Sequence, residues 1–510
     1  MQKSNKRILF CLILLVYSSL PLFAQKTGSE EDEFADFRKE IQSEYDDFRR
    51  EINREYADFL SKAWEEYRLF QGKSPDEVPK PLSPVLFQEE KNRQEMSLVN
   101  AETQKGIPLE DKQADQQGKK RDEKQEEKKV KEVERTLSSL LRNPAVDAAS
   151  ASLCCDYFGA ELRLQYEKRS FDLSTVAEHS VGNLWKDISD SRFSVLLADM
   201  IRYKKEMQMN DWAYFLLTEK VAARLSTLQS EDCRTVFQHF LLVQSGYDVR
   251  LARVDRFLVL LLPVREEVYA RPYLTVDGKQ YYVISNRSLK EHSSIFTYKL
   301  PEKLIQKAYL SLAMDRELLL PVQPKPFCIK AEGLEVKGEV NVNKIRFYRE
   351  YLSCELAVYA RAVPDEQLSK QLLASLSVCL KEKPRKEALN LLLTWVQKGF
   401  NYQTDGEQFG YEKPFFIEEN FFYPACDCED RAMLFAYLVN RLFGREVVLL
   451  DYPGHVATAV CIEQEEEEIK GAYLLLKGKK YIVCDPTYID AEVGMVMPSC
   501  KGKRPKVIRL

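Results

Sequence analysis

The sequence of 510 residues has few histidines and lacks the common signatures of metal and nucleotide enzymes. Its four histidines are widely separated, and no C-x-x-C motif accompanies them. A zinc site built from clustered cysteine and histidine ligands is therefore not expected. No Walker loop, dinucleotide-binding fingerprint, G-x-S-x-G or H-E-x-x-H motif occurs either. We therefore expect neither a metal nor a bound cofactor.

The chain also lacks a strong excess of charge of one sign. Its 75 basic and 79 acidic side chains leave a formal net charge of −4, which gives no reason to expect a nucleic-acid partner. The twelve cysteines include Cys11 near the N-terminus and are scattered through a large chain. This distribution does not indicate a disulfide framework, and most of them are interpreted as buried small hydrophobic residues.

The N-terminus has the pattern of a Sec signal peptide over residues 1–24. Three basic residues precede an apolar run at 8–23, and Ala24 offers a small residue for cleavage. The run is shorter than the ~20 residues that a membrane-spanning helix needs, although an uncleaved anchor is the alternative. No later segment is apolar enough to span a bilayer. We therefore expect a periplasmic or secreted protein without a membrane span after signal removal.

Residues 28–72 carry an 11-residue repeat that predicts one long amphipathic helix. Aromatic or apolar side chains recur in steps of 3, 4 and 4 over 31–71, beginning at Phe34 and ending at Phe70. A period of 11 residues keeps these side chains on one side of a nearly straight helix. The stripe either mediates self-association or contact with a partner protein, or lies on the body of this protein.

Composition suggests four further segments. Residues 73–136 contain almost no apolar residues beyond their first part, and we expect a polar disordered linker. Residues 137–300 combine strand and helix patterns and predict an α+β domain. A β-rich connecting region is expected at 301–363, and the chemistry falls in the last domain, residues 364–510. The fold class is accordingly α+β and multidomain, with a long N-terminal helix.

A complete nucleophile–base–orienter set lies in that last domain. Asp427 precedes an apolar-periodic run that ends before Gly444, which predicts a helix over 428–443 with Cys428 in its first turn. The helix N-terminus there is expected to favour a reactive thiolate. His455 is the only histidine after Cys428 and opens a predicted strand, and Asp485 ends the next long extended segment. A Cys428/His455/Asp485 triad is therefore our prediction.

These residues resemble the motifs of the transglutaminase-like superfamily, whose members share a papain-like fold. Cys428-Glu429-Asp430-Arg431-Ala432 matches its C-x-D-x-A motif, His455 opens a strand, and Asp485-Pro486-Thr487 matches its D-P-T motif. The resemblance covers about residues 390–490. It implies acyl transfer through a thioester at Cys428. Cys426 is a second thiol nearby, but it does not fit the motif, and we interpret it as a surface or packing residue.

The middle of the chain contains a segment with a similar outline. Residues 231–251 can be placed beside 428–450, and the pattern DGKQYYVIS resembles KGKKYIVCD. In this pairing Arg256 falls near the His455 position, Ser285 falls at the Asp485 position, and Cys233 lacks a base. A degenerate duplicate is one interpretation, and two unrelated α+β domains with common patterns are the other.

The sequence thus predicts an exported cysteine-dependent enzyme that acts on peptide or glutamine amides, either as a peptidase or as a transglutaminase-like acyltransferase. Its partner is expected to be a protein or peptide substrate. The alternative is a non-catalytic periplasmic scaffold or binding protein that uses a transglutaminase-like fold.

Overall fold

The structure is a computed structural model that describes residues 49–75, 78–87, 107–108, 150–225, 228–289, 293–300, 309–463 and 469–510. The predicted signal peptide at 1–24 lies outside these residues, so it stays a prediction. Within the described ranges the protein is a mixed α+β fold, and none of its helices is long and apolar enough to cross a membrane. The chain divides into two units between Asn53 and Arg54, and the second contains all the sheets of the described residues.

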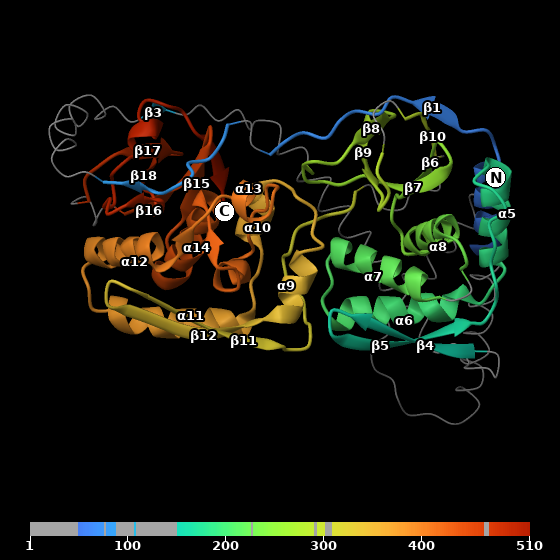
Figure 1. The fold of residues 1–510 in the computed structure, drawn as a ribbon, viewed down its shortest axis with the longest axis horizontal. Helices are drawn as coiled ribbons and strands as arrows, with labels where there is room; N and C mark the ends of the chain where they lie inside the picture. Colours follow the sequence, from blue (N-terminus) through green and yellow to red (C-terminus); the bar gives the residue numbers. More distant parts are fainter. Residues whose placement is uncertain are drawn as a thin grey trace, which may run out of the picture. The chain divides into compact units, whose positions relative to one another are not determined.

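The first group of elements in the second unit is a hairpin, four helices and a six-stranded sheet (Figure 1). The hairpin turns at Phe158 and Gly159, whose φ values of 47° and 84° suit a tight two-residue turn. The order of the sheet is β1-β10-β6-β7-β9-β8, and helix α8 packs on β7. The elements are β4 Ser150–Tyr157, β5 Ala160–Glu167, α5 Glu178–Ser189, α6 Phe193–Glu206, α7 Asp211–Arg224, α8 Glu231–Gln244, β6 Arg250–Val254, β7 Phe257–Leu262, β8 Tyr273–Val276, β9 Lys279–Ile284, β10 Ile295–Thr297 and β1 Glu65–Tyr67.

The second group has the same kinds of elements in the same order. A hairpin precedes three longer helices and a second six-stranded sheet, of order β20-β15-β16-β18-β17-β3, and helix α14 packs on β15 and β16. The hairpin and helices are β11 Pro324–Ala331, β12 Leu334–Asn341, α9 Val342–Tyr348, α10 Leu356–Arg361, α11 Glu366–Leu380, α12 Arg385–Gly399, α13 Asp405–Gln408, the 3-10 helix η2 Ile417–Phe421 and α14 Cys428–Phe443. The remaining elements are β15 Val447–Tyr452, β16 His455–Ile462, β17 Tyr473–Leu476, β18 Lys479–Cys484, β20 Lys506–Arg509, β3 Ile107–Pro108, β13 Asn401–Tyr402, β14 Ala425–Cys426, β2 Val85–Leu86, β19 Tyr488–Ile489 and the 3-10 helix η4 Pro498–Cys500.

The two sheets also agree in register. The hairpin β6–β7 closes with Val254 opposite Phe257, and the hairpin β15–β16 closes with Tyr452 opposite His455. Three residues further along, Leu260 pairs with Ile284 just as Thr458 pairs with Cys484. A one-residue slip would move every side chain of a strand to the other face of the sheet, so a shared register is a demanding agreement.

This agreement favours the interpretation of a duplicated chain, which stays a hypothesis. It also corrects one position within that hypothesis. Phe257, rather than Arg256, stands where His455 stands in the second sheet, while Ser285 follows β9 as Asp485 follows β18.

The long N-terminal helix ends earlier than expected. Residues 49–60 are helical, and the chain then turns at Ser61 and Lys62. Residues Glu65–Tyr67 form strand β1 and pair with β10, so the prediction of one continuous helix over 31–71 is wrong from residue 61 onward. Hydrogen bonding along a sheet edge here outweighs the local helical pattern. Residues 28–48 lie outside the described residues.

The aromatic stripe of residues 54–60 is covered by the protein itself. The Tyr56 ring stacks on Trp185 of α5, with ring centroids 4.3 Å apart, and its hydroxyl lies 3.4 Å from Nε2 of His239 in α8. Gly182 permits the close approach of α5, since a Cβ there would lie 2.7 Å from the carbonyl oxygen of Ala57. This stretch of the stripe therefore lies on the body of the protein. Partner contact through earlier residues stays a prediction.

Tyr56→Ala is expected to lower the free energy of unfolding by about 3–5 kcal/mol, because it removes a buried aromatic ring from a packed core. Urea unfolding followed by circular dichroism measures this change. Asp58→Ala is the control on the exposed face of the same helix, with an expected change within about 0.5 kcal/mol. Equal effects of the two variants would contradict the packing described above.

Two other expected segments also differ in the structure. Residues 78–87 belong to the expected linker 73–136, yet they lie against the second group of elements, where β2 pairs with β19. The expected β-rich region 301–363 contains helices α9 and α10 in its described part. Asn341 caps α9 by accepting a hydrogen bond from the Asn343 amide, which is a local helix signal within an otherwise strand-like pattern.

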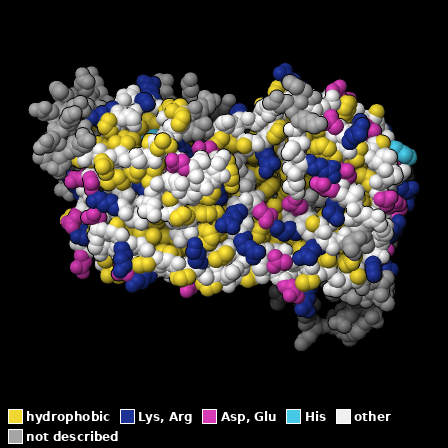
Figure 2. Space-filling view, viewed as in Figure 1, with side chains coloured by type: hydrophobic (Ala, Val, Ile, Leu, Met, Phe, Trp, Pro, Cys, Tyr) yellow, Lys and Arg dark blue, Asp and Glu magenta, His cyan; other side chains and the backbone are white. Residues whose placement is uncertain are grey.

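Charges of both signs are intermixed on the surface. Figure 2 shows Lys and Arg side chains interspersed with Asp and Glu over the described residues of that face. This distribution accords with the small net charge of the chain. The expectation of no nucleic-acid partner stays untested.

Candidate active site

Cys428 begins helix α14, as the sequence predicts. The helix spans Cys428–Phe443, and Gly444 ends it in the left-handed conformation at φ 65°. At its start the backbone amide of Asp427 donates a hydrogen bond to Oδ2 of Asp430 at 3.2 Å. The predicted helix over 428–443 is therefore confirmed, and the Cys428 side chain is buried in its first turn.

His455 and Asp485 meet at one end of the second sheet. His455 is the first residue of β16, and Asp485 directly follows β18, which pairs with β16. The His455 Nε2 atom lies 2.9 Å from Asp485 Oδ2. The other carboxylate oxygen of Asp485 accepts hydrogen bonds from the amides of Thr487 and Tyr488 at 3.0 and 3.2 Å. These bonds hold the carboxylate in the orientation that faces the imidazole.

The charge of Asp485 controls the protonation of His455. Burial lowers the pKa of His455, but the nearby Asp485 carboxylate more than offsets this effect and leaves the pKa above its usual value. The Nδ1 atom of His455 is buried and has no hydrogen-bond partner among the described residues. An orienting carboxylate on one ring nitrogen and a vacant second nitrogen are what a general base requires.

The Cys428 thiol lies near this pair but is held as a thiol. Its sulfur accepts a hydrogen bond from the backbone amide of Val456, the neighbour of His455, and donates one to Glu429 Oε2 at 3.2 Å. Burial, followed by the charges of Glu429 and Asp427, raises the pKa of Cys428 well above its usual value. Desolvation and the neighbouring carboxylates thus oppose the thiolate that the helix N-terminus was expected to favour, and the reactivity of Cys428 stays a prediction.

A lysine distant in the sequence occupies the space beside Cys428. The side chain of Lys80 is only 6% exposed, and its ammonium contacts Glu429 and lies 3.0 Å from Asp427 Oδ2. Glu412 and Asp405 complete the cluster at 2.6 and 3.8 Å. No sequence signal connects Lys80 to this site, because it falls in a proline-rich segment more than three hundred residues earlier.

The ion cluster has one firmly ionised pair. Burial lowers the pKa of Lys80, but the charges of Glu429 and Asp427 raise it above its usual value. Burial also raises the pKa of Glu429, yet Lys80 leaves that pKa below its usual range. Burial and the charge of Glu429 raise the pKa of Asp427 well above normal. The ammonium of Lys80 and the carboxylate of Glu429 therefore form the charged pair of the cluster.

The carboxylates of this cluster are also possible metal ligands. Asp405, Asp427 and Asp430 place one oxygen each within 4.8 Å of one another, and Asp427, Cys428 and Glu429 form a similar set. In this structure the Lys80 ammonium takes the position of a cation among them. The sequence-based expectation of no metal therefore stays a prediction.

Cys426 has a structural environment. It is buried in β14, and burial raises its pKa to about 12. Its sulfur lies 3.9 Å from the carbonyl oxygen of Asn401 on the neighbouring strand β13. Of the surface and packing roles that the sequence left open, these contacts favour packing.

Gln397 of α12 is a supporting residue that the sequence did not indicate. Its side-chain amide donates hydrogen bonds to the carbonyl oxygens of Asp485, Tyr488 and Ala491 at 3.0, 2.7 and 3.1 Å. It thereby anchors the loop that carries the Asp485 carboxylate. In the sequence, Gln397 is recognisable only as a polar residue on the apolar side of a predicted helix.

The equivalent positions of the first sheet carry different chemistry. Helix α8 begins with Glu231, where α14 begins with Cys428, and Phe257 stands at the histidine position. Arg287 pairs with Glu231 and Asp232 at 2.9 Å each. Among the described residues, this end of the first sheet has no nucleophile–base pair, and Arg287 neutralises its carboxylates.

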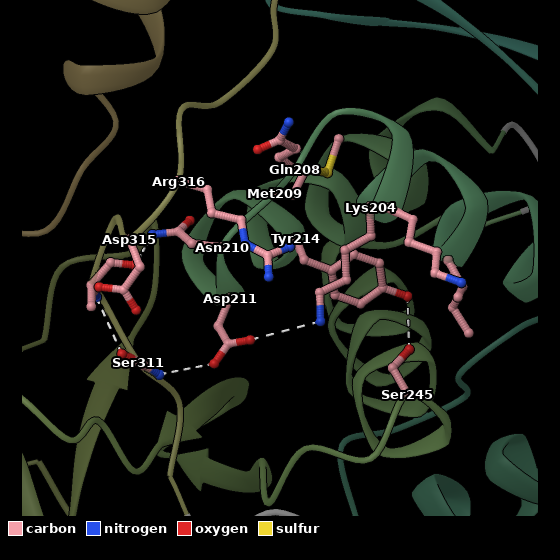
Figure 3. A pocket seen from close by; sticks show the side chains of 13 residues that line it. Lys204, Gln208, Met209, Asn210, Asp211, Tyr214, Ser245, Ser311, Asp315 and Arg316 are labelled. Atoms are coloured by element: carbon pink, nitrogen blue, oxygen red, sulfur yellow. Dashed lines mark hydrogen bonds and ion pairs between the residues drawn. The ribbon is translucent and has the colours of Figure 1, made fainter. Parts of the chain in front are cut away.

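A separate cavity of about 300 Å³ lies between α6, α7 and the segment around Ser311 (Figure 3). Asp211 is central to it and accepts hydrogen bonds from the Tyr247 hydroxyl at 2.8 Å and the Ser311 amide at 3.0 Å. None of the three predicted triad residues lines this cavity. The polar groups of Asp211 and Asn210 hold residues 311–313 against the helices.

Comparisons of the chain with protein-family models, with curated proteins and with solved structures each found no significant match.

Proposed function

We propose that this protein is an exported cysteine-dependent acyl-transfer enzyme of the transglutaminase-like type, with Cys428, His455 and Asp485 as its catalytic residues. The observation that carries the proposal is the bonded His455–Asp485 pair beside Val456, whose amide binds the Cys428 sulfur. Three residue types suited to amide chemistry thus converge from one helix and two paired strands.

The proposed reaction has two steps. Cys428, deprotonated by His455 Nδ1, attacks the carbon of a peptide or glutamine amide, and the backbone amide of Cys428 stabilises the oxyanion. The C–N bond breaks as the imidazolium protonates the leaving amine, and Asp485 orients the ring throughout. Water then hydrolyses the thioester, or an amine accepts the acyl group. We favour hydrolysis, because it requires no second acceptor site.

Mass spectrometry of the signal-free protein mixed with a panel of peptide and glutamine amides tests the proposal. A transient adduct on Cys428, with release of the amine, is the expected result. The adduct is detectable even if product release is slow. If no peptide or amide in the panel gave either an adduct or turnover, the result would count against an enzyme.

The second candidate is a non-catalytic scaffold with a transglutaminase-like fold. The burial of Cys428 and the raised pKa of its thiol favour this candidate. In a scaffold the triad residues would hold the end of the sheet together, and the Cys428 environment would not change on exposure to substrate.

Thiol labelling across pH distinguishes the two candidates. In an enzyme that opens to substrate, His455 stabilises the thiolate, so iodoacetamide labels Cys428 at pH 7 at least roughly 10-fold faster in the wild type than in His455→Ala. The exposed Cys379 is the internal reference thiol. In a scaffold, Cys428 stays unlabelled in both proteins until the pH approaches its raised pKa.

A further inference from the structure

Residues 78–87 cross the candidate active site as an extended segment. At one end, a Cβ on Gly454, just before His455, would lie 2.9 Å from the carbonyl oxygen of Pro79. At the other end, strand β2 pairs with β19 in parallel, and the Phe87 amide donates to the Ile489 carbonyl oxygen at 2.9 Å. The segment thus runs from the turn before His455 to the strand after Asp485.

Lys80 is the charged side chain that this segment inserts. Its ammonium lies among Asp427, Glu429 and Glu412 beside the Cys428 sulfur. By contrast, Leu82 and Leu86 of the same segment are 72% and 64% exposed. Val85 and Phe87 of the segment pack against the core of the second sheet, and Lys80 is the charged side chain that the segment buries. Lysine is almost never fully buried unless it is paired. The segment is thus held by ordinary strand packing at one end and by one buried, paired lysine at the other.

The carboxylates around Lys80 need a cation. Glu429 and Asp427 are buried, and one oxygen of Asp427 has no hydrogen-bond partner among the described residues. Removal of the Lys80 ammonium would leave a buried carboxylate without its counter-ion, which is costly. A substrate that displaces the segment must therefore either supply a replacement cation or accept that cost.

We infer that the cluster of Asp405, Glu412, Asp427 and Glu429 is a binding site for the ammonium group of a lysine side chain in the substrate, which Lys80 occupies as an internal substitute. This inference rests on the proposed function for its substrate class. The carboxylates keep the ammonium charged, so the cluster recognises a cation and does not activate an attacking amine. The substrate is then an extended peptide that adds along β19, as β2 does.

Peptide binding in a Cys428→Ala background tests this site without any chemistry. The probes are two labelled peptides of the sequence of residues 78–87, one with lysine and one with the uncharged isostere norleucine at the position of Lys80. In the full signal-free chain carrying Lys80→Ala, the lysine peptide is expected to bind roughly 10- to 100-fold more tightly, as charge-assisted hydrogen bonds give. Adding Glu429→Gln should bring the two affinities close together.

Lys73→Ala is the matched control, because Lys73 pairs with Glu267 outside the cluster. This variant should bind both peptides as weakly as the chain with Lys80 intact. Equal affinity of the two peptides for the Lys80→Ala chain, or binding of neither, would overturn the inference. Binding of Zn²⁺ or Ca²⁺ without preference for the lysine peptide would overturn it as well.

A second measurement guards against a Lys80→Ala chain that does not fold. In the Cys428→Ala chain with Lys80 intact, excess lysine peptide should accelerate hydrogen exchange at the Phe87 amide, because it displaces the segment. The norleucine peptide should leave that exchange rate unchanged, and no acceleration by either peptide would contradict the inference. Neither assay requires Cys428, so a failure of the proposed catalysis and a failure of this site are separable.

Discussion

Cys428→Ala is expected to abolish thioester formation and to lower turnover of any amide substrate by roughly 10⁴- to 10⁶-fold, as the loss of a nucleophile does. The fold should survive, because alanine is tolerated at the first turn of a helix and the substitution removes one atom. Turnover assays together with thermal unfolding of the same preparation measure both quantities.

Cys426→Ala is the matched control for this variant. Cys426 is equally buried two residues earlier, but its sulfur lies near a backbone carbonyl on β13 and away from the His455 pair. Its replacement should change turnover by less than roughly 10-fold and act mainly on stability. If Cys426→Ala abolished turnover and Cys428→Ala did not, the assignment of the nucleophile would be wrong.

His455→Ala is expected to lower kcat by roughly 10³- to 10⁴-fold, because it removes the proton acceptor and donor of both steps. Asp485→Asn should lower kcat by less, since the imidazole remains present but is poorly oriented. Steady-state kinetics on one substrate compares the two variants. Similar losses for both would mean that the Asp485 hydrogen bond, and not the imidazole alone, limits the reaction.

The same pair predicts a pH dependence of stability. The folded pKa of His455 lies above its unfolded value because of Asp485. The stabilisation from this ion pair is therefore fully present below about pH 6.5, the unfolded value, and is lost as the pH rises through the folded pKa. Asp485→Asn should accordingly destabilise the protein more at pH 6 than at pH 9, in urea unfolding at the two pH values. A larger loss at pH 9 would contradict the pairing.

Short-range patterns were sufficient for several elements of the second group. The Asp427 cap, the apolar period and Gly444 predicted helix α14 with its observed bounds. His455 opens β16 and Asp485 follows β18 because turn residues stand directly before the one and after the other. These signals act over a few residues, so neighbouring sequence contains the information needed.

Patterns were insufficient where a distant strand decided the local structure. Aromatic residues spaced for a helix continue past residue 60, yet Glu65–Tyr67 form an edge strand because β10 offers hydrogen-bond partners. Similarly, the strand-like pattern after residue 341 becomes helix α9, with Lys344 buried against Asp365 at 2.7 Å. Tertiary contacts supply energies comparable to the small differences between local preferences.

By itself, the sequence determined the nature and order of the candidate catalytic residues, Cys428, His455 and Asp485, and the elements that carry them. Only the tertiary structure decided the state of the nucleophile and the occupant of the site. Lys80 lies 349 positions from Glu429 in the chain, yet the two form a buried ion pair. The pKa of Cys428 depends on desolvation and on carboxylates that the fold gathers around it. Both depend on distances through space, which residue order along the chain does not specify.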